Sequence, residues 1–233
     1  MTPPPRGLAI ASLTFFSLLA LVFGWQLFAV PTVLFIPPGL AFIPGCLFGG
    51  ADLPGGVTGL PPPATLVTYQ FLHAGWLHLL GNLVFLWIFG PRVERTLGPG
   101  RWTVLLLACG VAAALAQAWP EPSSSVAMVG ASGGISGLLG AYLFLHPRDE
   151  LRLELPGVPG MQLPAWVVLL SWFGLQLLYA NWSETLPGGV AFPAHVGGFA
   201  CGLLLAPVLQ FLALLSADAR AVARTLRSRD SSH

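Results

Sequence analysis

Four polar side chains interrupt long apolar stretches of this chain, and together they could carry out nucleophilic chemistry. Ser132 opens one apolar run, His195 lies near the start of a later one, and His78 and Asn82 lie near the start of an earlier one. A serine hydroxyl becomes a nucleophile when a histidine accepts its proton, and His and Asn donors can stabilise an oxyanion. Polar groups in such apolar surroundings are costly, which makes these four functional candidates.

The elements that must position these residues are apolar helices. Hydrophobic residues make up 55% of the 233 and charged residues 8%, whereas a soluble domain carries about 25% charged residues. A run of about 20 apolar residues spans the hydrocarbon core of a bilayer. We therefore predict an all-α membrane protein with six transmembrane helices, at about 8–30, 75–90, 102–119, 131–146, 163–181 and 190–215. The segment 31–70 is rich in Pro and Gly, which predicts a structured first loop.

The arginines predict the topology. All ten basic residues are Arg, and they lie at the N-terminus, in the second and fourth loops and after the last helix. Because basic residues accumulate on the cytoplasmic side, both termini are expected to be cytoplasmic. We divide the chain into a cytoplasmic N-terminus at 1–7, a membrane domain at 8–216 and a basic cytoplasmic tail at 217–233.

This topology predicts that the four candidates share one layer. The second, fourth and sixth helices all run inward, and each carries its candidate residues near its outer end. The fourth helix has about 16 residues, which gives about 24 Å at a rise of about 1.5 Å per residue. Since this is less than the hydrocarbon thickness of about 30 Å, Ser132 is expected several Å below the outer surface, in a cavity that admits water.

Small residues predict which helices approach closely. Gly133 and Gly137 are spaced GxxxG on the fourth helix, and Ala194, Gly198 and Gly202 form a similar stripe on the sixth. Such stripes allow close backbone contact, which would place Ser132 beside His195. Two further polar residues lie in the spans, and we interpret both as ordinary helix–helix hydrogen-bonding residues: Gln117 and Gln176.

The motifs around these candidates resemble those of a known family. Gly130-Ala131-Ser132-Gly133, with Ala194-His195-Val196-Gly197-Gly198 later, is similar to the paired signature of rhomboid intramembrane serine proteases. The stretch 73–82, continuing to Gly90 and Glu94, resembles the second-helix motif of that family. The resemblance covers about 65–205. No strand is expected at the GxSG sequence, unlike in soluble hydrolases with this motif.

The resemblance implies a serine endopeptidase with a Ser–His dyad. Ser132 would be the nucleophile and His195 its base, while His78, Asn82 and the Ser132 backbone N–H would form the oxyanion hole. His73 would have a structural role, as would three glycines near the site, Gly130, Gly133 and Gly198. The implied substrates are transmembrane proteins cut near their outer end, and neither cofactor nor metal is implied.

The sequence departs from the family pattern beside the dyad. In many members, the position four residues after the nucleophile carries an aromatic ring that stacks on the catalytic histidine, but here it is Ser136. We expect Phe199 or Tyr142 to support His195 instead. The first loop also lacks the Trp-Arg pair that is common in the family.

Two other interpretations stay open. A non-catalytic rhomboid-like protein would bind or escort membrane proteins, but such relatives usually lose the dyad. A transporter or channel would carry polar residues through the full bilayer depth, whereas the candidates here are expected only in its outer half. The net charge of +1 argues against a nucleic-acid partner. Short tails without an Arg- and Ser-rich transit segment favour a bacterial plasma membrane, so the expected partners are the lipid bilayer and membrane-protein substrates.

Overall fold

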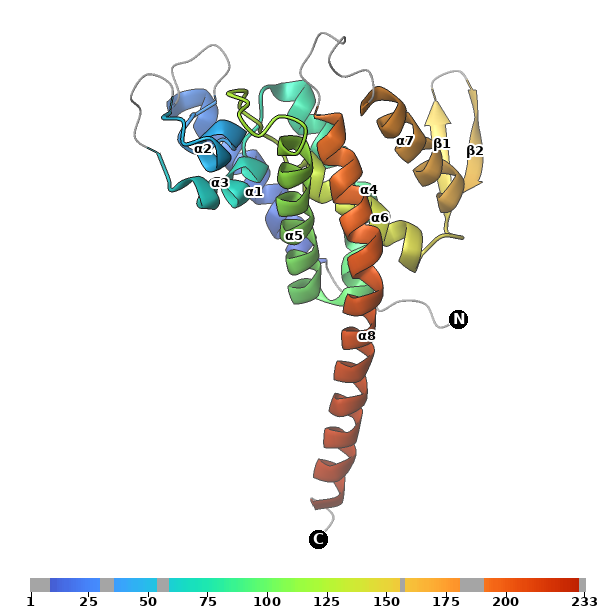
Figure 1. Ribbon diagram of the computed structural model, residues 1–233. Coiled ribbons are helices and arrows are strands. Elements are labelled where there is room, and N and C mark those ends of the chain that lie inside the picture. The colour runs from blue at the N-terminus through green and yellow to red at the C-terminus, as the bar shows by residue number, and fades with distance from the viewer. Residues whose placement is uncertain (1–8, 30–35, 54–58, 156–157, 181–190, 231–233) are drawn as a thin grey trace.

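Helices make up most of the chain in the computed structural model, which describes residues 9–29, 36–53, 59–155, 158–180 and 191–230 (Figure 1). The six principal helices are α1 (Ile10–Ala29), α4 (Trp76–Leu97), α5 (Pro99–Ala118), α6 (Ser132–Leu145), α7 (Ala165–Ala180) and α8 (Phe192–Asp230). By length and apolar composition, α1, α4, α5 and the first part of α8 can cross a membrane, and α6 and α7 are shorter apolar helices. The expected all-α membrane bundle is confirmed.

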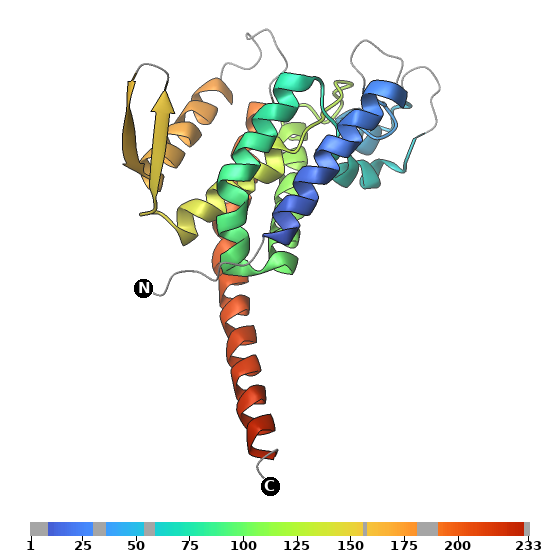
Figure 2. The same cartoon turned by 180° about the vertical axis from the view of Figure 1, so that it is seen from behind.

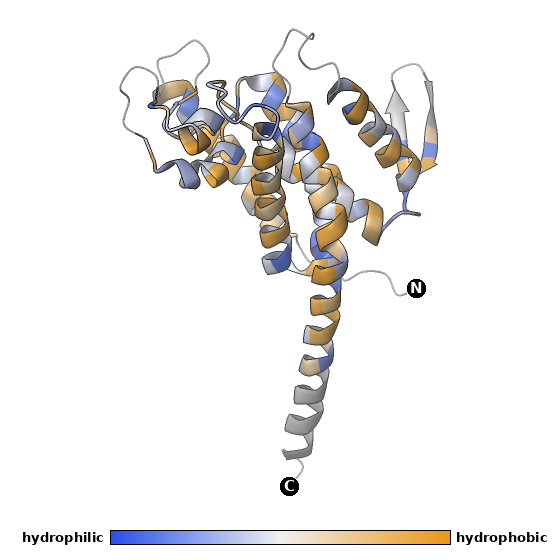
Figure 3. Cartoon of the chain, viewed as in Figure 1, coloured by the Kyte–Doolittle hydropathy of each residue, from blue (hydrophilic) through white to orange (hydrophobic). Residues whose placement is uncertain are grey.

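The short helix α6 forms the centre of the bundle. It packs against α4, α5 and α8, and every residue from Gly133 to Tyr142 is buried. Seen from behind, α1 and α4 lie side by side on one flank (Figure 2). Large apolar side chains of α8, such as Leu204, Val208 and Phe211, are exposed. Figure 3 shows that hydrophobic residues predominate along the part of α8 that lies within the bundle. An exposed apolar face of this extent is what hydrocarbon chains of a bilayer cover.

The first loop is structured, as expected, and it is tied to the loop that precedes α6. It contains α2 (Pro44–Phe48), α3 (Pro62–Thr68) and the 3-10 helix η2 (Tyr69–Phe71). Phe42 and Met128 form an antiparallel bridge in which Phe42 N donates to Met128 O at 3.1 Å and Met128 N donates to Phe42 O at 2.7 Å. The segment leading to Ser132 is therefore held by the first loop as well as by the bundle.

A β-hairpin between α6 and α7 is a departure from the expected all-helical chain. Strand β1 (Glu150–Leu155) pairs antiparallel with β2 (Val158–Pro164), with Glu150 opposite Pro164. The hairpin lies beside α7 (Figures 1 and 2). The residues of β1 alternate between charged and Leu, the period-two pattern of a strand with one apolar face, and Leu151 packs against the core of the bundle.

The N-terminus of α1 is held by a buried carboxylate of α4. Glu94 accepts hydrogen bonds from Ala11 N at 2.9 Å, from Ser12 N at 2.8 Å and from Ser12 Oγ at 2.7 Å. The first N–H groups of a helix have no acceptor within the helix, and they carry partial positive charge. Glu94 supplies both the acceptors and the compensating charge, so it fixes α1 to α4.

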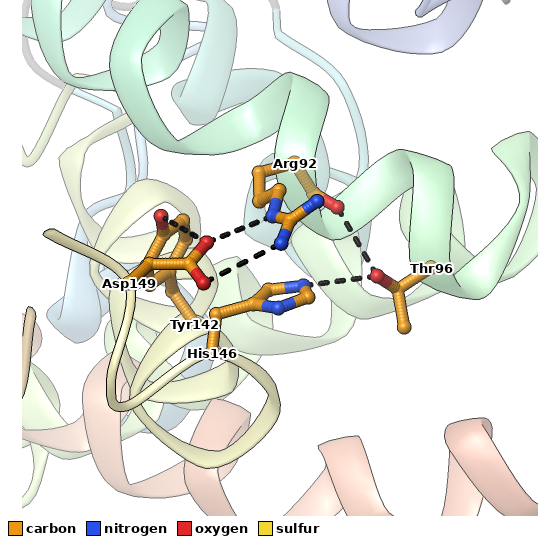
Figure 4. Close-up of polar contacts among 5 residues, drawn as sticks. All are labelled: Arg92, Thr96, Tyr142, His146 and Asp149. Carbon is orange, nitrogen blue, oxygen red and sulfur yellow. Dashed lines mark hydrogen bonds and ion pairs between the residues drawn. The ribbon is translucent and has the colours of Figure 1, made fainter. Parts of the chain in front are cut away.

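A polar cluster joins the C-terminal ends of α4 and α6, at the opposite end of α4 from His78 (Figure 4). Arg92 Nε donates to Asp149 Oδ2 at 2.8 Å, and Tyr142 Oη donates to the same oxygen at 3.2 Å. Thr96 Oγ1 and His146 Nε2 are 2.9 Å apart. Asp149 O then accepts from the backbone N–H of Ala165 at 2.8 Å, which links this cluster to the start of α7.

The pKa values of His146 and Asp149 in this cluster are both shifted. Burial and then the Arg92 charge lower the pKa of His146 below 6.5, against the opposing charge of Asp149. Partial burial raises the pKa of Asp149, but the hydrogen bond and charge of Arg92 outweigh it, so the pKa lies below its ordinary value. Both shifts therefore favour a neutral His146 and an ionised Asp149.

Helix α8 is far longer than the last span expected from the sequence. It continues to Asp230, through most of the segment 217–233 that is expected from the sequence to be a separate tail. Its 39 residues correspond to about 58 Å at about 1.5 Å per residue. In Figure 1 it extends well beyond the other helices. The part of α8 within the bundle and this extension therefore form one continuous helix.

Candidate active site

Ser132 and His195 are hydrogen-bonded. Ser132 Oγ lies 2.9 Å from His195 Nε2. Ser132 is the first residue of α6, and His195 lies in the first turn of α8. Both side chains are partly buried. A serine hydroxyl at this distance from an imidazole nitrogen has the geometry in which the imidazole can accept its proton during attack.

Gly130 determines how the chain enters α6. Its φ of +118° lies in a backbone region that residues with a side chain rarely adopt. Its N–H donates to Tyr69 O at 2.9 Å. A Cβ atom at this position would lie 2.6 Å from His78 Nε2. Glycine is therefore required here both by the backbone conformation and by the imidazole that packs against it.

The glycines of α6 and α8 face one another as the spacing predicts. A Cβ atom on Gly198 would overlap the carbonyl group of Gly133, and one on Gly202 would overlap that of Gly137. Gly133 also packs against Ala113 of α5. Close backbone approach of α6 and α8 is what brings the first residue of one helix to the first turn of the other.

His78 and Asn82 lie next to the Gly130 turn. They are one turn apart on the same face of α4, and Asn82 is buried. Asn82 Nδ2 is 3.8 Å from where a Cβ atom on residue 130 would lie, and the His78 ring is closer. His78 Nδ1 accepts a hydrogen bond from Ala74 N at 3.5 Å. The structure thus places both side chains beside the loop that delivers Ser132.

His73 is fully buried behind His78. Its backbone N–H donates to Gln26 Oε1 at 3.0 Å, and Gln26 Nε2 donates to its carbonyl oxygen at 3.1 Å. Its ring packs edge-on against Phe23 and His78, with centroid separations of 6.4 and 5.1 Å. His73 therefore connects α1 to the turn before α4 and supports the ring of His78.

The second ring nitrogen of His195 has a partner that the sequence does not predict. His195 Nδ1 lies 2.8 Å from Gln176 Oε1 of α7. The sequence predicts only an ordinary helix–helix hydrogen bond for Gln176. It does join two helices, but it does so through the imidazole of the candidate base. An isolated amide in an apolar run was the only sequence signal, and nothing in its spacing pointed to His195.

The ring contacts of His195 also differ from those expected. They are with Trp172, at a centroid distance of 6.1 Å, and with Phe192, at 6.3 Å. Phe199 packs on Trp172, one ring further away, whereas Tyr142 contacts Phe89 and His146. The support expected from Phe199 or Tyr142 is therefore provided by other aromatic residues.

Two polar residues near the dyad bond to backbone. Ser136 is buried, and its Oγ donates to the carbonyl oxygen of Ser132 at 2.6 Å. Gln117 Oε1 of α5 accepts from Ala194 N at 3.3 Å, so it bonds the first turn of α8 next to His195. The described ranges contain no group of three or more His, Cys, Asp or Glu residues that could hold a metal ion.

Comparison with known proteins adds to this geometry. The family model of the rhomboid domain matches residues 63–210. The chain belongs to the rhomboid family. The rhomboid match includes Ser132, His195 and the residues of α4, α7 and α8 described around them. The two helices that carry the candidate dyad are thus part of the rhomboid domain itself.

Several curated relatives resemble this rhomboid domain. A putative rhomboid protease YdcA of Bacillus subtilis is 33% identical over 141 residues, covering 60% of this chain and 64% of that protein. The rhomboid protease GlpG of Pectobacterium atrosepticum is 32% identical over 139 residues, covering 60% and 46%. Mitochondrial rhomboid protein 1 of Saccharomyces cerevisiae is 28% identical over 144 residues, covering 60% and 40%. The chain thus spans less than two thirds of each relative's length.

Proposed function

We propose that this rhomboid protein is an intramembrane serine endopeptidase that uses Ser132 and His195. The observation that carries the proposal is the 2.9 Å contact between Ser132 Oγ and His195 Nε2. Two relatives that bear the name rhomboid protease, in Bacillus subtilis and Pectobacterium atrosepticum, support it.

Acylation begins when His195 Nε2 accepts the proton of Ser132 Oγ, and the oxygen attacks the carbonyl carbon of the scissile peptide bond. The tetrahedral intermediate collapses as the C–N bond breaks, and the leaving amine takes the proton from His195. The product is an acyl ester on Ser132. A water molecule, deprotonated by His195, then attacks the ester, and the carboxylic acid leaves as Ser132 regains its proton.

The developing oxyanion is assigned to donors at the start of α6. The backbone N–H of Ser132 belongs to the first turn of the helix, where N–H groups lack acceptors within the helix and partial positive charge accumulates. The side chains of His78 and Asn82, which flank the Gly130 turn, are proposed as further donors. Donors fixed before the reaction stabilise the transition state without reorganisation.

The substrates are proposed to be membrane-spanning segments of other proteins, cut near their outer end. A transmembrane helix satisfies its own peptide groups, so a segment must unwind locally before its carbonyl can be attacked. We place both termini on the cytoplasmic side, because the arginines accumulate on that side. We further propose that the membrane is a bacterial plasma membrane. His195 and Ser132, at the N-terminal ends of α8 and α6, then lie toward the outer face.

The test uses purified protein reconstituted with a labelled single-span substrate. We expect the wild-type protein to cleave it and both Ser132→Ala and His195→Ala to be inactive. A fluorophosphonate probe should label Ser132 in the wild type and fail to label either variant. Persistent cleavage by the Ser132→Ala variant would exclude the proposed mechanism. Absence of both cleavage and labelling in the folded wild type would favour a non-catalytic binding role.

A further inference from the structure

Helix α7 presents two side chains to the imidazole of His195. Gln176 Oε1 lies 2.8 Å from Nδ1, and the Trp172 ring lies 6.1 Å from the imidazole, centroid to centroid. Residues 172 and 176 are four apart, so they lie on one face of the helix. His195 is part of α8 and contacts Ser132 of α6, so α7 is a third helix in contact with its imidazole.

We propose that Gln176 is a positioning residue for His195, holding its imidazole in the tautomer that accepts the Ser132 proton. This inference rests on the proposed dyad. An amide oxygen can only accept a hydrogen bond, so its contact with Nδ1 requires a proton on that nitrogen. A neutral imidazole protonated at Nδ1 has its lone pair at Nε2, the atom 2.9 Å from Ser132 Oγ.

The same contact strengthens as the reaction proceeds. Once Nε2 takes the serine proton, the imidazole is a cation, and the hydrogen bond from Nδ1 to Gln176 Oε1 becomes charge-assisted. In a Ser–His–Asp triad, an aspartate fulfils this role. Among the described residues, no acidic side chain is hydrogen-bonded to His195. A neutral amide orients the base without placing a second charge in apolar surroundings, where a carboxylate would be costly.

Gln176 also contributes to the support of the His195 imidazole, which Ser136 does not provide. Ser136 Oγ donates to the Ser132 carbonyl oxygen, and a serine has no aromatic ring that could stack on the imidazole. Trp172 and Phe192 provide the ring contacts. Gln176 provides direction, because a hydrogen bond fixes the rotation of the imidazole about its Cβ–Cγ bond and an aromatic contact alone does not. The hydrogen bond and the ring contacts together determine where Nε2 points.

The experiment compares three variants in the full-length reconstituted protein. Gln176→Met keeps the length and shape of the side chain but removes the amide oxygen, and Gln176→Glu keeps an acceptor at the same place. Leu175→Ala is the control, because Leu175 is the adjacent residue of α7 and is half exposed. We expect Gln176→Met to lower kcat about tenfold to a hundredfold with little change in KM, since loss of an orienting partner affects the reacting geometry. Gln176→Glu should lose less kcat than Gln176→Met, because it retains the acceptor, but it should stay below the wild type, because a carboxylate is costly in apolar surroundings.

A readout that does not depend on activity accompanies the kinetics. Nitrogen-15 spectra of labelled histidine, with the His195 signal assigned by its loss in His195→Ala, report which ring nitrogen carries the proton. We expect a protonated Nδ1 in the wild type and a mixture of tautomers in Gln176→Met. Unchanged kcat and tautomer in Gln176→Met would overturn the proposal, as would equal losses in the Met and Glu variants.

The two proposals fail in different ways. If the wild-type protein neither cleaves substrate nor reacts with a fluorophosphonate, the proposed function is wrong. The tautomer of His195 would still show whether Gln176 directs it. If the wild type is active while Gln176→Met matches it in kcat, in labelling rate and in tautomer, only the positioning role is wrong.

Discussion

Gly198 of α8 lies directly against the backbone carbonyl group of Gly133 of α6, with no room for a methyl group between them. Gly202 has the same relationship to Gly137 one turn further along. The separation of the two helices is therefore set by contact between main-chain atoms. Because Ser132 and His195 lie at the end of this contact, their separation depends on it directly.

A methyl group at Gly198 is expected to abolish activity. The Gly198→Ala side chain would overlap the Gly133 carbonyl, which forces the helices apart and moves Nε2 from Ser132 Oγ. We expect kcat to fall by more than about a hundredfold, since misplacement of about 1 Å between reacting groups has an effect of that size. Gly24→Ala is the matched control, because nothing lies within 4 Å of the added atom. Full activity in Gly198→Ala would contradict the packing argument.

Removal of the Asn82 side chain is expected to slow the chemical step. If Asn82 donates to the oxyanion, Asn82→Ala should lower kcat about 10²–10³-fold, the usual cost of one such donor, with KM nearly unchanged. Leu80→Ala, a half-exposed position on the same helix, serves as the control. The measurement is single-turnover cleavage in proteoliposomes. A variant with normal kcat would show that the Ser132 N–H and His78 suffice.

Loss of the Glu94 carboxylate is expected to lower the stability of the fold rather than the rate of the chemical step. Glu94→Ala leaves the N–H groups of Ala11 and Ser12 without the acceptor they have in the structure, and each buried unsatisfied group costs about 1–3 kcal/mol. Glu94→Gln keeps one acceptor oxygen and should lie between wild type and Glu94→Ala. Thermal unfolding in detergent measures the effect. Equal melting temperatures for all three proteins would contradict this role.

Acidification is expected to weaken the cluster around His146. The pKa of His146 is lowered below 6.5 in the folded protein, so the unfolded chain binds the proton more readily, and stability falls as the pH drops below about 6.5. The lowered pKa of Asp149 acts in the same direction, but only at lower pH, where its carboxylate begins to be protonated. Both contributions are fully present at neutral pH.

The difference in melting temperature between pH 7.5 and pH 5.5 measures the histidine contribution. His146→Gln retains a polar partner for Thr96 and does not titrate, so its melting temperature should depend less on pH than that of the wild type. The comparison excludes Asp149, which stays ionised over this range. An identical pH dependence in the variant would show that another group is responsible.

The helices and the approach of Ser132 to His195 could be predicted because their signals are local. Apolar length marks the spans, and the spacing of Gly133, Gly137, Gly198 and Gly202 marks the faces that meet. The orientation of the bundle in the membrane and the roles of His78 and Asn82 stay predictions.

The residues that support His195 could not be predicted, because their signals are not local. Gln176 and Trp172 reach the imidazole only through the packing of α7 against α8, and no spacing within either helix specifies that register. The sequence does not predict the hairpin, for a different reason. Its alternating leucines are visible in the sequence, but they lie in a short loop with Arg148 and Arg152, which favours a solvated connection.

The burial of α6 separates two properties that are coupled in most membrane helices. With 14 residues, α6 is about 21 Å long and would create a severe hydrophobic mismatch if it faced lipid directly. Because α4, α5 and α8 enclose it, the acyl chains meet those longer helices instead. The bilayer thickness that suits the protein is therefore set by its outer helices, while the depth of Ser132 is set independently by the residue at which α6 begins.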